Sequence, residues 1–330
     1  MEYLFDYLAF AAKAVTIALL LIVPALLLAV LVAGRRRQGI ESNLEVRKLN
    51  DQLLERQLVL EAALLLPKQF KQRLKQVKKE QKAIDQATAR PRLFVCDFNG
   101  DVRAQGVASL REEITAILAV AGALDEVAVV LESAGGTVHG YGLAASQLRR
   151  VRDRGIRLTI IVDKIAASGG YMMACVANEI LAAPFAIIGS IGVVAQLPNF
   201  HRLLRKHDID FEQVTAGKYK RTLTLFGENT DADRAKFQEE IDDAHALFKE
   251  FVADQRPQLD LERVATGEYW FGTRALSLGL VDRLSTSDEF ICIKAAAVAV
   301  FKIKAIAPKT LRERLLSSAR SLFGERLPFS

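Results

Sequence analysis

The longest predominantly apolar stretch of the chain lies close to its N-terminus. Residues 14–33 read AVTIALLLIVPALLLAVLVA, and only Thr16 and Pro24 fall outside the apolar set. A helix rises about 1.5 Å per residue, so a run of this length is enough to cross a hydrocarbon core of about 30 Å. A cleaved signal peptide would need a positively charged segment before the run, whereas Glu2 and Asp6 precede it. The pattern favours an uncleaved membrane-anchoring helix.

A charged connector follows the apolar run. Arg35, Arg36 and Arg37 come directly after it, and the positive-inside rule would keep this flank, and the chain that follows it, in the cytoplasm. Leucines then recur at loosely helical intervals before Pro67. This spacing predicts an amphipathic helix or a short coiled coil built on Leu44, Leu49, Leu53, Leu54, Leu58 and Leu60.

Basic residues dominate the stretch after Pro67, with few acidic residues between them: Lys68, Lys71, Arg73, Lys75, Lys78, Lys79 and Lys82. A solvated helix face is the simplest explanation. Attraction to anionic lipid headgroups, at about 1 kcal/mol per basic residue near a membrane surface, is a sharper one. Nucleic acid is the least favoured partner, because the run lacks regularly spaced aromatic residues on which bases could stack.

A different pattern begins at Pro91. Short aliphatic runs alternate with helical periodicity, which is typical of an α/β core around a largely parallel sheet. The predicted strands cover residues 93–98, 127–131 and 158–162, and the predicted helices cover residues 109–120, 140–152 and 168–177. A further apolar stretch, residues 180–195, is short and contains Pro184 and two glycines, so we expect buried core there and not a second membrane span.

Two strand-to-helix turns in this region are rich in small residues. Parallel sheets keep their chemistry at the carboxyl ends of strands, where such turns lie. The first reads ESAGG, and its pair Gly135 and Gly136 lets backbone N–H groups approach a ligand, although a tight turn is the simpler explanation of an isolated pair. The second reads DKIAASGGY. Its Ser168 opens a helix and Gly169 offers an unobstructed N–H to an oxyanion, while a serine that only caps the helix explains the same pattern.

A serine nucleophile needs a base beside it. Lysine is one option, because a buried amine can lose its proton and deprotonate a serine. Residues 216–222, AGKYKRT, place two lysines on a short polar loop. Histidine is the other, and only His139 follows the glycine turn closely enough to lie near Ser168. No pattern marks any of the four histidines as a base: His139, His201, His207 and His245.

Composition narrows the class of protein. The chain has 330 residues, 51% hydrophobic and 25% charged, which excludes a disordered or fibrous chain. Its three cysteines have no close spacing, so no disulfide framework or thiolate metal cluster is readable. The formal net charge is +6, but residues 35–92 carry +8 and residues 302–330 carry +5, while residues 93–301 carry −6. The positive charge therefore lies in the segment beside the membrane anchor and in the C-terminal tail, and does not indicate a nucleic-acid site.

Ordered motifs between residues 91 and 285 give the sequence a family resemblance. They read ESAGG, DKIAASGGYMMACVAN, GSIGVV, AGKYKRTLTLFGENT and YWFGTRALSLGLVD. In this order they resemble the signal peptide peptidase A family of serine peptidases, most closely its short, membrane-anchored SohB-type branch. The resemblance implies an α/β fold with a ClpP/crotonase-like parallel-sheet core, an N-terminal transmembrane helix and a helical connector. It also implies catalysis without a metal or other cofactor.

The resemblance assigns roles to five residues. Ser168 matches the nucleophile of the family, and Lys220 matches its general base. Ser190 matches a serine that hydrogen-bonds and orients the lysine amine. The backbone N–H groups of Gly136 and Gly169 match the oxyanion hole.

Other positions qualify this match. The family commonly has proline where Ala134 stands, a departure that removes no catalytic group. Lys218 lies two residues before Lys220 and competes with it for the role of base. Small residues around Ser168 predict a tight apolar groove for a peptide, formed by Ala166, Ala167, Ala174 and Ala182.

The resemblance implies a membrane-anchored serine endopeptidase with a Ser-Lys dyad that cleaves hydrophobic peptides, such as signal-peptide remnants or membrane-protein fragments. We expect peptide substrates, contact with membrane lipid, a homo-oligomeric ring and no nucleic-acid partner. Residues 200–251 have helical character and offer material for packing between subunits. We therefore expect the chain to cross a bacterial inner membrane once. The catalytic domain would be cytoplasmic by the charge rule and outside by the family resemblance.

Four parts of the chain are predicted: a membrane anchor over residues 1–34, a charged helical connector over 35–91, a serine peptidase domain over 92–285, and an extension with a basic tail over 286–330. The sequence of the tail predicts an amphipathic helix that lies on a membrane surface or contacts another subunit. Two other functional classes stay open. One is an enoyl-CoA hydratase-like enzyme of the same superfamily, for which Glu132 is the only acid nearby, and the other is a non-catalytic membrane scaffold built on the connector.

Overall fold

The computed structural model describes residues 43–86 and 91–306, together with four single positions nearer the N-terminus. Within these residues no helix is both long and apolar enough to cross a membrane. The predicted anchor over residues 14–33, apart from two single positions in it, and the basic tail after residue 306 lie outside the described residues. Residues 44–305 form one compact unit.

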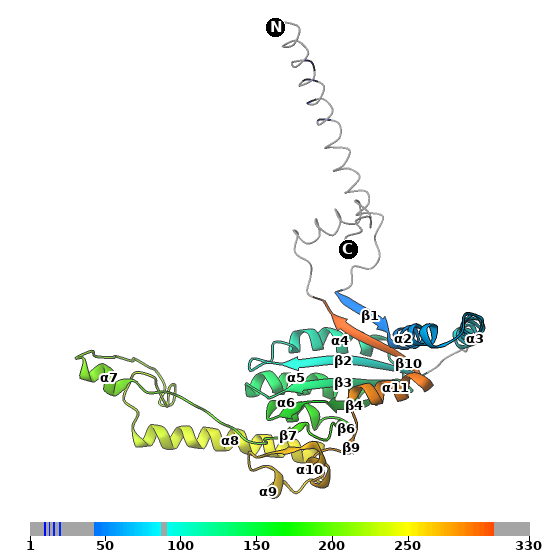
Figure 1. Cartoon of the computed structure of the whole chain (residues 1–330). Helices are drawn as coiled ribbons and strands as arrows, with labels where there is room; N and C mark the ends of the chain where they lie inside the picture. Colours follow the sequence, from blue (N-terminus) through cyan, green and yellow to red (C-terminus); the bar gives the residue numbers. More distant parts are fainter. Residues whose placement is uncertain are drawn as a thin grey trace. The chain divides into compact units, whose positions relative to one another are not determined.

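A sheet organises this unit, and its strands are mostly parallel (Figure 1). The order across the sheet is β1-β10-β2-β3-β4-β6-β9, and every neighbouring pair is parallel except β1 with β10. The strands are β1 (Leu44–Lys48), β2 (Arg92–Gly100), β3 (Glu126–Ser133), β4 (Arg157–Val162), β6 (Glu179–Ala182), β9 (Arg283–Leu284) and β10 (Ala299–Ala305). The predicted α/β fold with a parallel sheet core is confirmed.

Three short strands branch from this sheet at the carboxyl end of β3. They are β5 (Ile165–Ala167), β7 (Ile187–Gly189) and β8 (Tyr269–Phe271). Ser133 at the end of β3 pairs with Ala166, so β5 extends the sheet beyond the point where β4 ends. β7 then pairs parallel with β5, and β8 pairs antiparallel with β7. These strands bring the segment after Ala167 beside the segment after Gly189.

Helices cover both faces of the sheet, which explains why the central strands read as almost continuous apolar runs. In β2, Phe94 and Cys96 belong to the larger core cluster, while Leu93 and Val95 belong to a smaller cluster on the other face. The larger cluster includes residues of α4 (Val107–Val120), α5 (Val138–Asp153) and α6 (Gly169–Ala174). The smaller one is closed by α2 (Leu49–Leu64) and α11 (Ser287–Ala297).

The first and last strands of the described unit, β1 and β10, pair with each other in antiparallel orientation. Leu44 in β1 lies opposite Ala305 in β10. The N–H of Ile306 donates to the carbonyl of Asn43 at 2.6 Å, which continues the ladder by one step. The helix predicted from Leu44 onward therefore begins only at Leu49, because the residues before it are taken up by β1. α3 (Pro67–Gln86) follows α2 and completes a helical hairpin.

An arm formed by residues 193–230 leaves the sheet after β7 (Figure 1). It carries one short helix, α7 (His201–Lys206), and is otherwise irregular. α8 (Asp231–Gln255) returns the chain to the sheet, and it starts with a capping box between Thr230 and Asp233. The helical character predicted over residues 200–251 is thus confirmed for α7 and α8 but wrong for residues 207–230. α9 (Leu261–Val264) and α10 (Gly272–Ser277) complete the fold.

The elements predicted between residues 93 and 177 are confirmed. β2, β3 and β4 include all three predicted strands, and α4, α5 and α6 correspond to the three predicted helices. The apolar stretch 180–195 contributes β6 and β7, whose residues are largely buried, as expected of core. The boundaries of the four predicted parts of the chain stay predictions.

Candidate active site

Ser168 occupies a strained turn between β5 and α6. Its backbone angles are φ 52° and ψ −120°, a combination that non-glycine residues rarely adopt. The side chain makes no capping hydrogen bond to α6, so a helix-capping role does not explain this serine. The Ser168 N–H donates to the carbonyl of Gly189 at 2.8 Å. A sharp strand-to-helix turn of this kind presents a hydroxyl in front of a helix, as nucleophilic serines require.

Close packing behind Ser168 requires the two glycines that follow it. A Cβ at Gly169 would lie 2.4 Å from Cγ of Tyr141, and one at Gly170 would lie 2.5 Å from the carbonyl oxygen of Ser133. Tyr141 is fully buried, and its hydroxyl donates to the carbonyl of Asp101 at 2.8 Å. Its hydroxyl also lies 2.5 Å from Oγ of Ser133. Burial raises the pKa of Tyr141, so the phenol stays neutral and keeps its proton for the bond to Asp101.

The first glycine turn packs directly on the second. Gly135 has φ 90°, and a Cβ there would lie 2.7 Å from the nitrogen of Gly169 and 2.8 Å from Cβ of Ser168. Gly136 lies against the backbone of Val102, whose carbonyl oxygen would be 2.1 Å from an added Cβ. Among the described residues, neither the Gly136 N–H nor the Gly169 N–H has a hydrogen-bond acceptor. Two unengaged N–H groups beside a serine are what an oxyanion hole needs.

Ser190 lies beside Ser168 because β5 and β7 pair in register. Ala167 is opposite Gly189, so the two serines follow at the same level of adjacent strands. Ser190 also has a positive φ, 52°, and its N–H donates to the carbonyl of Glu268 at 2.6 Å. Of the residues predicted from the sequence, the fold therefore gathers Ser168, Ser190, Gly136 and Gly169.

Lys220 is separate from this group within a single chain. It lies exposed on the arm, where its N–H donates to the carbonyl of Gly217 at 3.2 Å. A cavity of about 700 Å³ beside it is lined by arm residues only and includes none of the other predicted site residues. In the described chain no hydrogen bond joins Lys220 to Ser168 or Ser190. Lys218 is exposed as well, with its amine 5.0 Å from the ring centre of Tyr219.

Neither of the two alternative residues considered from the sequence, His139 and Glu132, replaces the lysine in the described part of the chain. His139 is exposed at the start of α5 and makes no hydrogen bond to Ser168. Glu132, the acid considered for an enoyl-CoA hydratase-like site, forms an ion pair with Lys164 at 2.9 Å, and both side chains are well exposed. The Glu132 carboxylate is therefore held in a surface ion pair.

The predicted groove of small residues is wrong as a surface feature. All four alanines are buried, and their small side chains allow α6 and the strands to pack closely: Ala166, Ala167, Ala174 and Ala182. Tyr141 and Ser133, which support the turn from below, were not predicted. An aromatic residue in a helix and a serine at a strand end are ordinary core residues in a sequence, and only the packing shows their contact with the turn.

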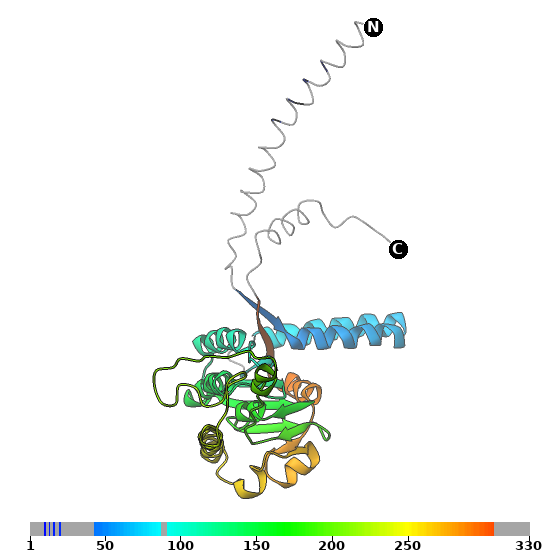
Figure 2. The same cartoon turned by 90° about the vertical axis from the view of Figure 1, so that its left-hand side faces the viewer.

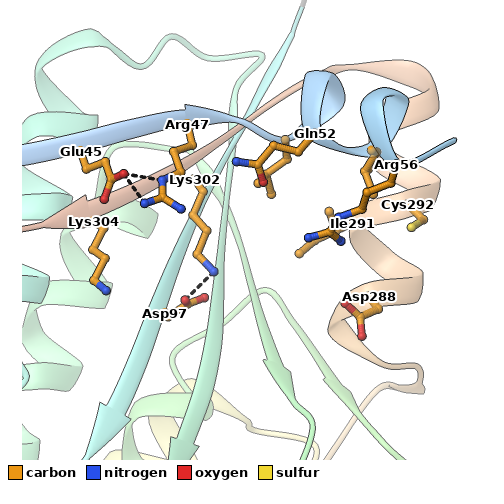
Figure 3. Close-up of a pocket in the computed structure, with 12 residues that line it drawn as sticks. Glu45, Arg47, Gln52, Arg56, Asp97, Asp288, Ile291, Cys292, Lys302 and Lys304 are labelled. Carbon is orange, nitrogen blue, oxygen red and sulfur yellow. Dashed lines mark hydrogen bonds and ion pairs between the residues drawn. The ribbon is translucent and has the colours of Figure 1, made fainter. Parts of the chain in front are cut away.

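A separate charged pocket lies on the opposite face of the sheet, on the side of α2 and α11 (Figure 3). Its volume is about 400 Å³. Its lining includes two ion pairs, Arg47 with Glu45 and Lys302 with Asp97, the latter at 2.6 Å. The exposed thiol of Cys292 lies at its rim. No residue of the candidate site lines this pocket, so the strained turn at Ser168 is the better candidate for catalysis.

Comparisons with known proteins agree with the motifs. Residues 2–148 match the model of the N-terminal part of peptidase family S49, and residues 150–300 match the model of peptidase family S49 itself. The chain is 57% identical over 236 residues to the "Probable protease SohB" of Buchnera aphidicola subsp. Acyrthosiphon pisum, a match that covers 72% of this chain and 70% of that protein.

A second relative is the "Probable protease SohB" of Haemophilus influenzae, 57% identical over 219 residues, which are 66% of this chain and 62% of that protein. Among solved structures, the 1510-N membrane-bound stomatin-specific protease is similar at a TM-score of 0.46 and 13% identity, over 67% of this chain and 100% of that one. That likeness is too distant to add to the assignment, which rests on the sequence matches. The chain belongs to peptidase family S49, the signal peptide peptidase A family, and within it to the SohB type.

Proposed function

We propose that this chain is a membrane-anchored serine endopeptidase in which Ser168 is the nucleophile and Lys220 is the general base. Membership of peptidase family S49 supports a serine protease. The choice of nucleophile rests on the backbone conformation of Ser168. Its φ is 52°, although its side chain makes no hydrogen bond that caps α6. Strain at a residue without a structural role for its side chain is typical of functional sites.

The proposed reaction uses four groups of this chain. The Ser168 hydroxyl attacks the carbonyl carbon of the peptide bond while the neutral amine of Lys220 takes its proton. The N–H groups of Gly136 and Gly169 donate to the oxyanion that forms, and Lys220 returns the proton to the departing amine. Water then attacks the carbonyl carbon of the acyl ester while Lys220 accepts a proton from it. The ester bond breaks, the carboxylic acid product leaves, and Lys220 returns the proton to the Ser168 oxygen. Ser190, beside Ser168, is suited to orienting the amine.

Assembly of several copies would bring Lys220 to a serine. The arm that carries Lys220 exposes large apolar side chains, among them Val214 at 96% and Leu203 at 54% exposure. Exposed apolar groups on a projecting segment favour a contact with another surface. A homo-oligomeric ring would cover the arm, and burial among apolar groups favours the neutral amine that a base needs. We therefore propose that the dyad is completed when the arm is packed, either on its own chain or on a neighbouring copy.

Hydrophobic peptides, such as signal-peptide remnants or fragments of membrane proteins, are the proposed substrates. An aromatic cluster near the turn supports this class: the rings of Phe185 and Phe271 are 6.0 Å apart, and those of Tyr269 and Phe271 are 6.2 Å apart. All three side chains are exposed. Tyr269 and Phe271 belong to β8, and Phe185 comes shortly before β7. Among the described strands β8 pairs only with β7, which leaves its other edge for an extended peptide.

The finer features of the fold and its location belong to the same proposal. We propose a ClpP/crotonase-like core, one membrane span over residues 14–33, contact with membrane lipid, and attachment to a bacterial inner membrane. Arg35–Arg37 favour a cytoplasmic catalytic domain, and the family resemblance favours the outside. The charge distribution gives no reason to expect nucleic acid as a partner. A non-catalytic scaffold is disfavoured by the strained Ser168, and an enoyl-CoA hydratase-like enzyme by the outward ion pair of Glu132.

Labelling with a serine-directed fluorophosphonate and cleavage of a hydrophobic reporter peptide test the proposal in the full chain. Ser168→Ala is expected to lose both label and cleavage, and Lys220→Ala to lose cleavage by at least about 100-fold. Lys218→Ala is the matched control on the same loop and should retain cleavage. A fully active Lys220→Ala variant would exclude the dyad, and loss of cleavage in Lys218→Ala alone would make Lys218 the base.

A further inference from the structure

The hairpin of α2 and α3 ends in a tip with a largely apolar sequence. Residues 58–67 read LVLEAALLLP, with Glu61 as the only charged residue. The Glu61 carboxylate forms an ion pair with Arg73 of α3, whose Nε lies 3.3 Å from it. Figure 2 shows the two helices, drawn in blue, running side by side away from the sheet. We call residues 58–67 the hairpin tip.

Four aliphatic side chains of the hairpin tip are exposed. Leu64 is 83% exposed, Leu66 and Val59 are each 67% exposed, and Leu60 is 66% exposed. Single exposed leucines are ordinary, but a group of them at the end of a projecting element marks an interaction site.

A series of lysines begins next to this apolar group and continues along α3. The exposed ones are Lys68, Lys71, Lys75, Lys78 and Lys79. None of these five forms an ion pair in the part of the chain that the structure describes. Within α3 only two residues are acidic, Glu80 and Asp85, and Glu80 faces Arg73 at 3.6 Å. Unpaired cations beside exposed leucines match a surface that is anionic outside and apolar just beneath.

We propose that the hairpin tip inserts into the headgroup region of an anionic lipid bilayer, with its leucines among the upper acyl chains and the α3 lysines against lipid phosphates. A second copy of the same tip fits less well as the occupant, because it would bring two sets of unpaired lysines together. The apolar surface together with the lysine array therefore selects a membrane over a like partner.

Chain length permits this contact. The inference rests on the anchor proposed above, which ends near residue 33, ten residues before the described unit begins at Leu44. An extended segment of that length spans at most about 35 Å. The 16 residues of α2 place the tip about 24 Å along the helix from its start at Leu49. β1 adds at most about 17 Å between Leu44 and Leu49. The connection therefore lets the hairpin tip reach the bilayer surface in which the anchor is embedded when the hairpin lies oblique to that surface.

Depth-dependent fluorescence quenching in the full chain tests the proposal. In a Cys292→Ser background the two remaining cysteines are buried, so a Leu64→Cys variant can be labelled at the tip with an environment-sensitive fluorophore. Gln76→Cys, an exposed position further along α3, is the matched control. The chain is reconstituted in vesicles of phosphatidylcholine with phosphatidylglycerol, or of phosphatidylcholine alone, each containing brominated lipid.

We expect quenching by brominated lipid at residue 64 to exceed that at residue 76 by at least about threefold in the anionic vesicles. Lys68→Gln, Lys71→Gln and Lys75→Gln together should reduce it, whereas Lys206→Gln on the arm should not. A label at residue 64 that aqueous iodide quenches freely would refute the proposal. A label shielded from both iodide and brominated lipid would also refute it, and would show that protein covers the tip.

The same preparation separates this inference from the proposals on which it depends. A chain that does not float with the vesicles after an alkaline wash contradicts the anchor and the tip contact together. A chain that floats, but whose label reports water, contradicts the tip contact alone. Fluorophosphonate labelling of Ser168 in the same vesicles reports on the peptidase independently of either result.

Discussion

Replacing Ser168 by glycine is expected to make the fold more stable while it removes the proposed nucleophile. The serine is held at φ 52° and ψ −120°, and a non-glycine residue in a sparsely populated backbone region costs about 1–3 kcal/mol. Glycine removes this strain but loses about 0.5–1 kcal/mol through its greater freedom in the unfolded chain. Since the Ser168 side chain caps nothing, its removal costs little. Ser168→Gly should therefore be more stable than Ser168→Ala by up to about 2.5 kcal/mol.

Urea unfolding of the full chain in detergent measures this difference. Both variants lack the hydroxyl, so the comparison isolates the backbone. Ser146 in the middle of α5 provides the control, because it is exposed and has a helical environment. There glycine should be less stable than alanine by about 1 kcal/mol, which is the opposite order. If Ser168→Gly were less stable than Ser168→Ala, as at Ser146, the strain argument and the choice of nucleophile based on it would be refuted.

Two further predictions concern the packing behind the site and the opposite end of the sheet. Gly170→Ala should destabilise the fold by about 1–3 kcal/mol, because its Cβ would lie 2.5 Å from the carbonyl oxygen of Ser133. Gly142→Ala, with open space around the added Cβ, should not destabilise it, and equal urea midpoints for the two variants would contradict the packing argument. Burial raises the pKa of Glu113, whose Oε1 accepts the N–H of Ala305 at 2.8 Å while Oε2 has no partner among the described residues. The folded state thus disfavours the charged carboxylate, so the free energy of unfolding falls as the pH rises above the ordinary pKa of 4.5. Glu113→Gln should flatten this pH dependence and raise the urea midpoint at pH 7. An unchanged pH profile in this variant would contradict the prediction.

The central part of the fold was predictable because its signals are local. β2, β3 and β4 are buried on both faces and flanked by amphipathic helices, so periodicity alone locates them. β1 was missed because LEVRK does not resemble a buried strand, and its pairing with β10 depends on residues about 250 positions away. The short β5, β7 and β8 have only three residues each, too few for a period to appear.

The candidate site divides in the same way. The glycine turn and the serine turn were visible in the sequence because strand ends and small residues mark them, and parallel topology brings them together. The positive φ of Ser168 and of Ser190 was not visible, because it is imposed by Tyr141, Gly135 and the pairing of β5 with β7. The choice of Lys220 over Lys218 rested on the resemblance alone. Its position relative to Ser168 depends on how the arm packs, and no local pattern encodes that.

The pairing of β1 with β10 has a mechanical consequence for a chain held at both ends. Asn43 and Ile306 leave the unit at the same end of an antiparallel ladder. Tension applied between them would load the hydrogen bonds one after another, as in unzipping, and not all at once, as in shear. β1 should therefore peel away at low force and take its five residues out of the sheet, while the parallel strands that carry the Ser168 turn remain paired.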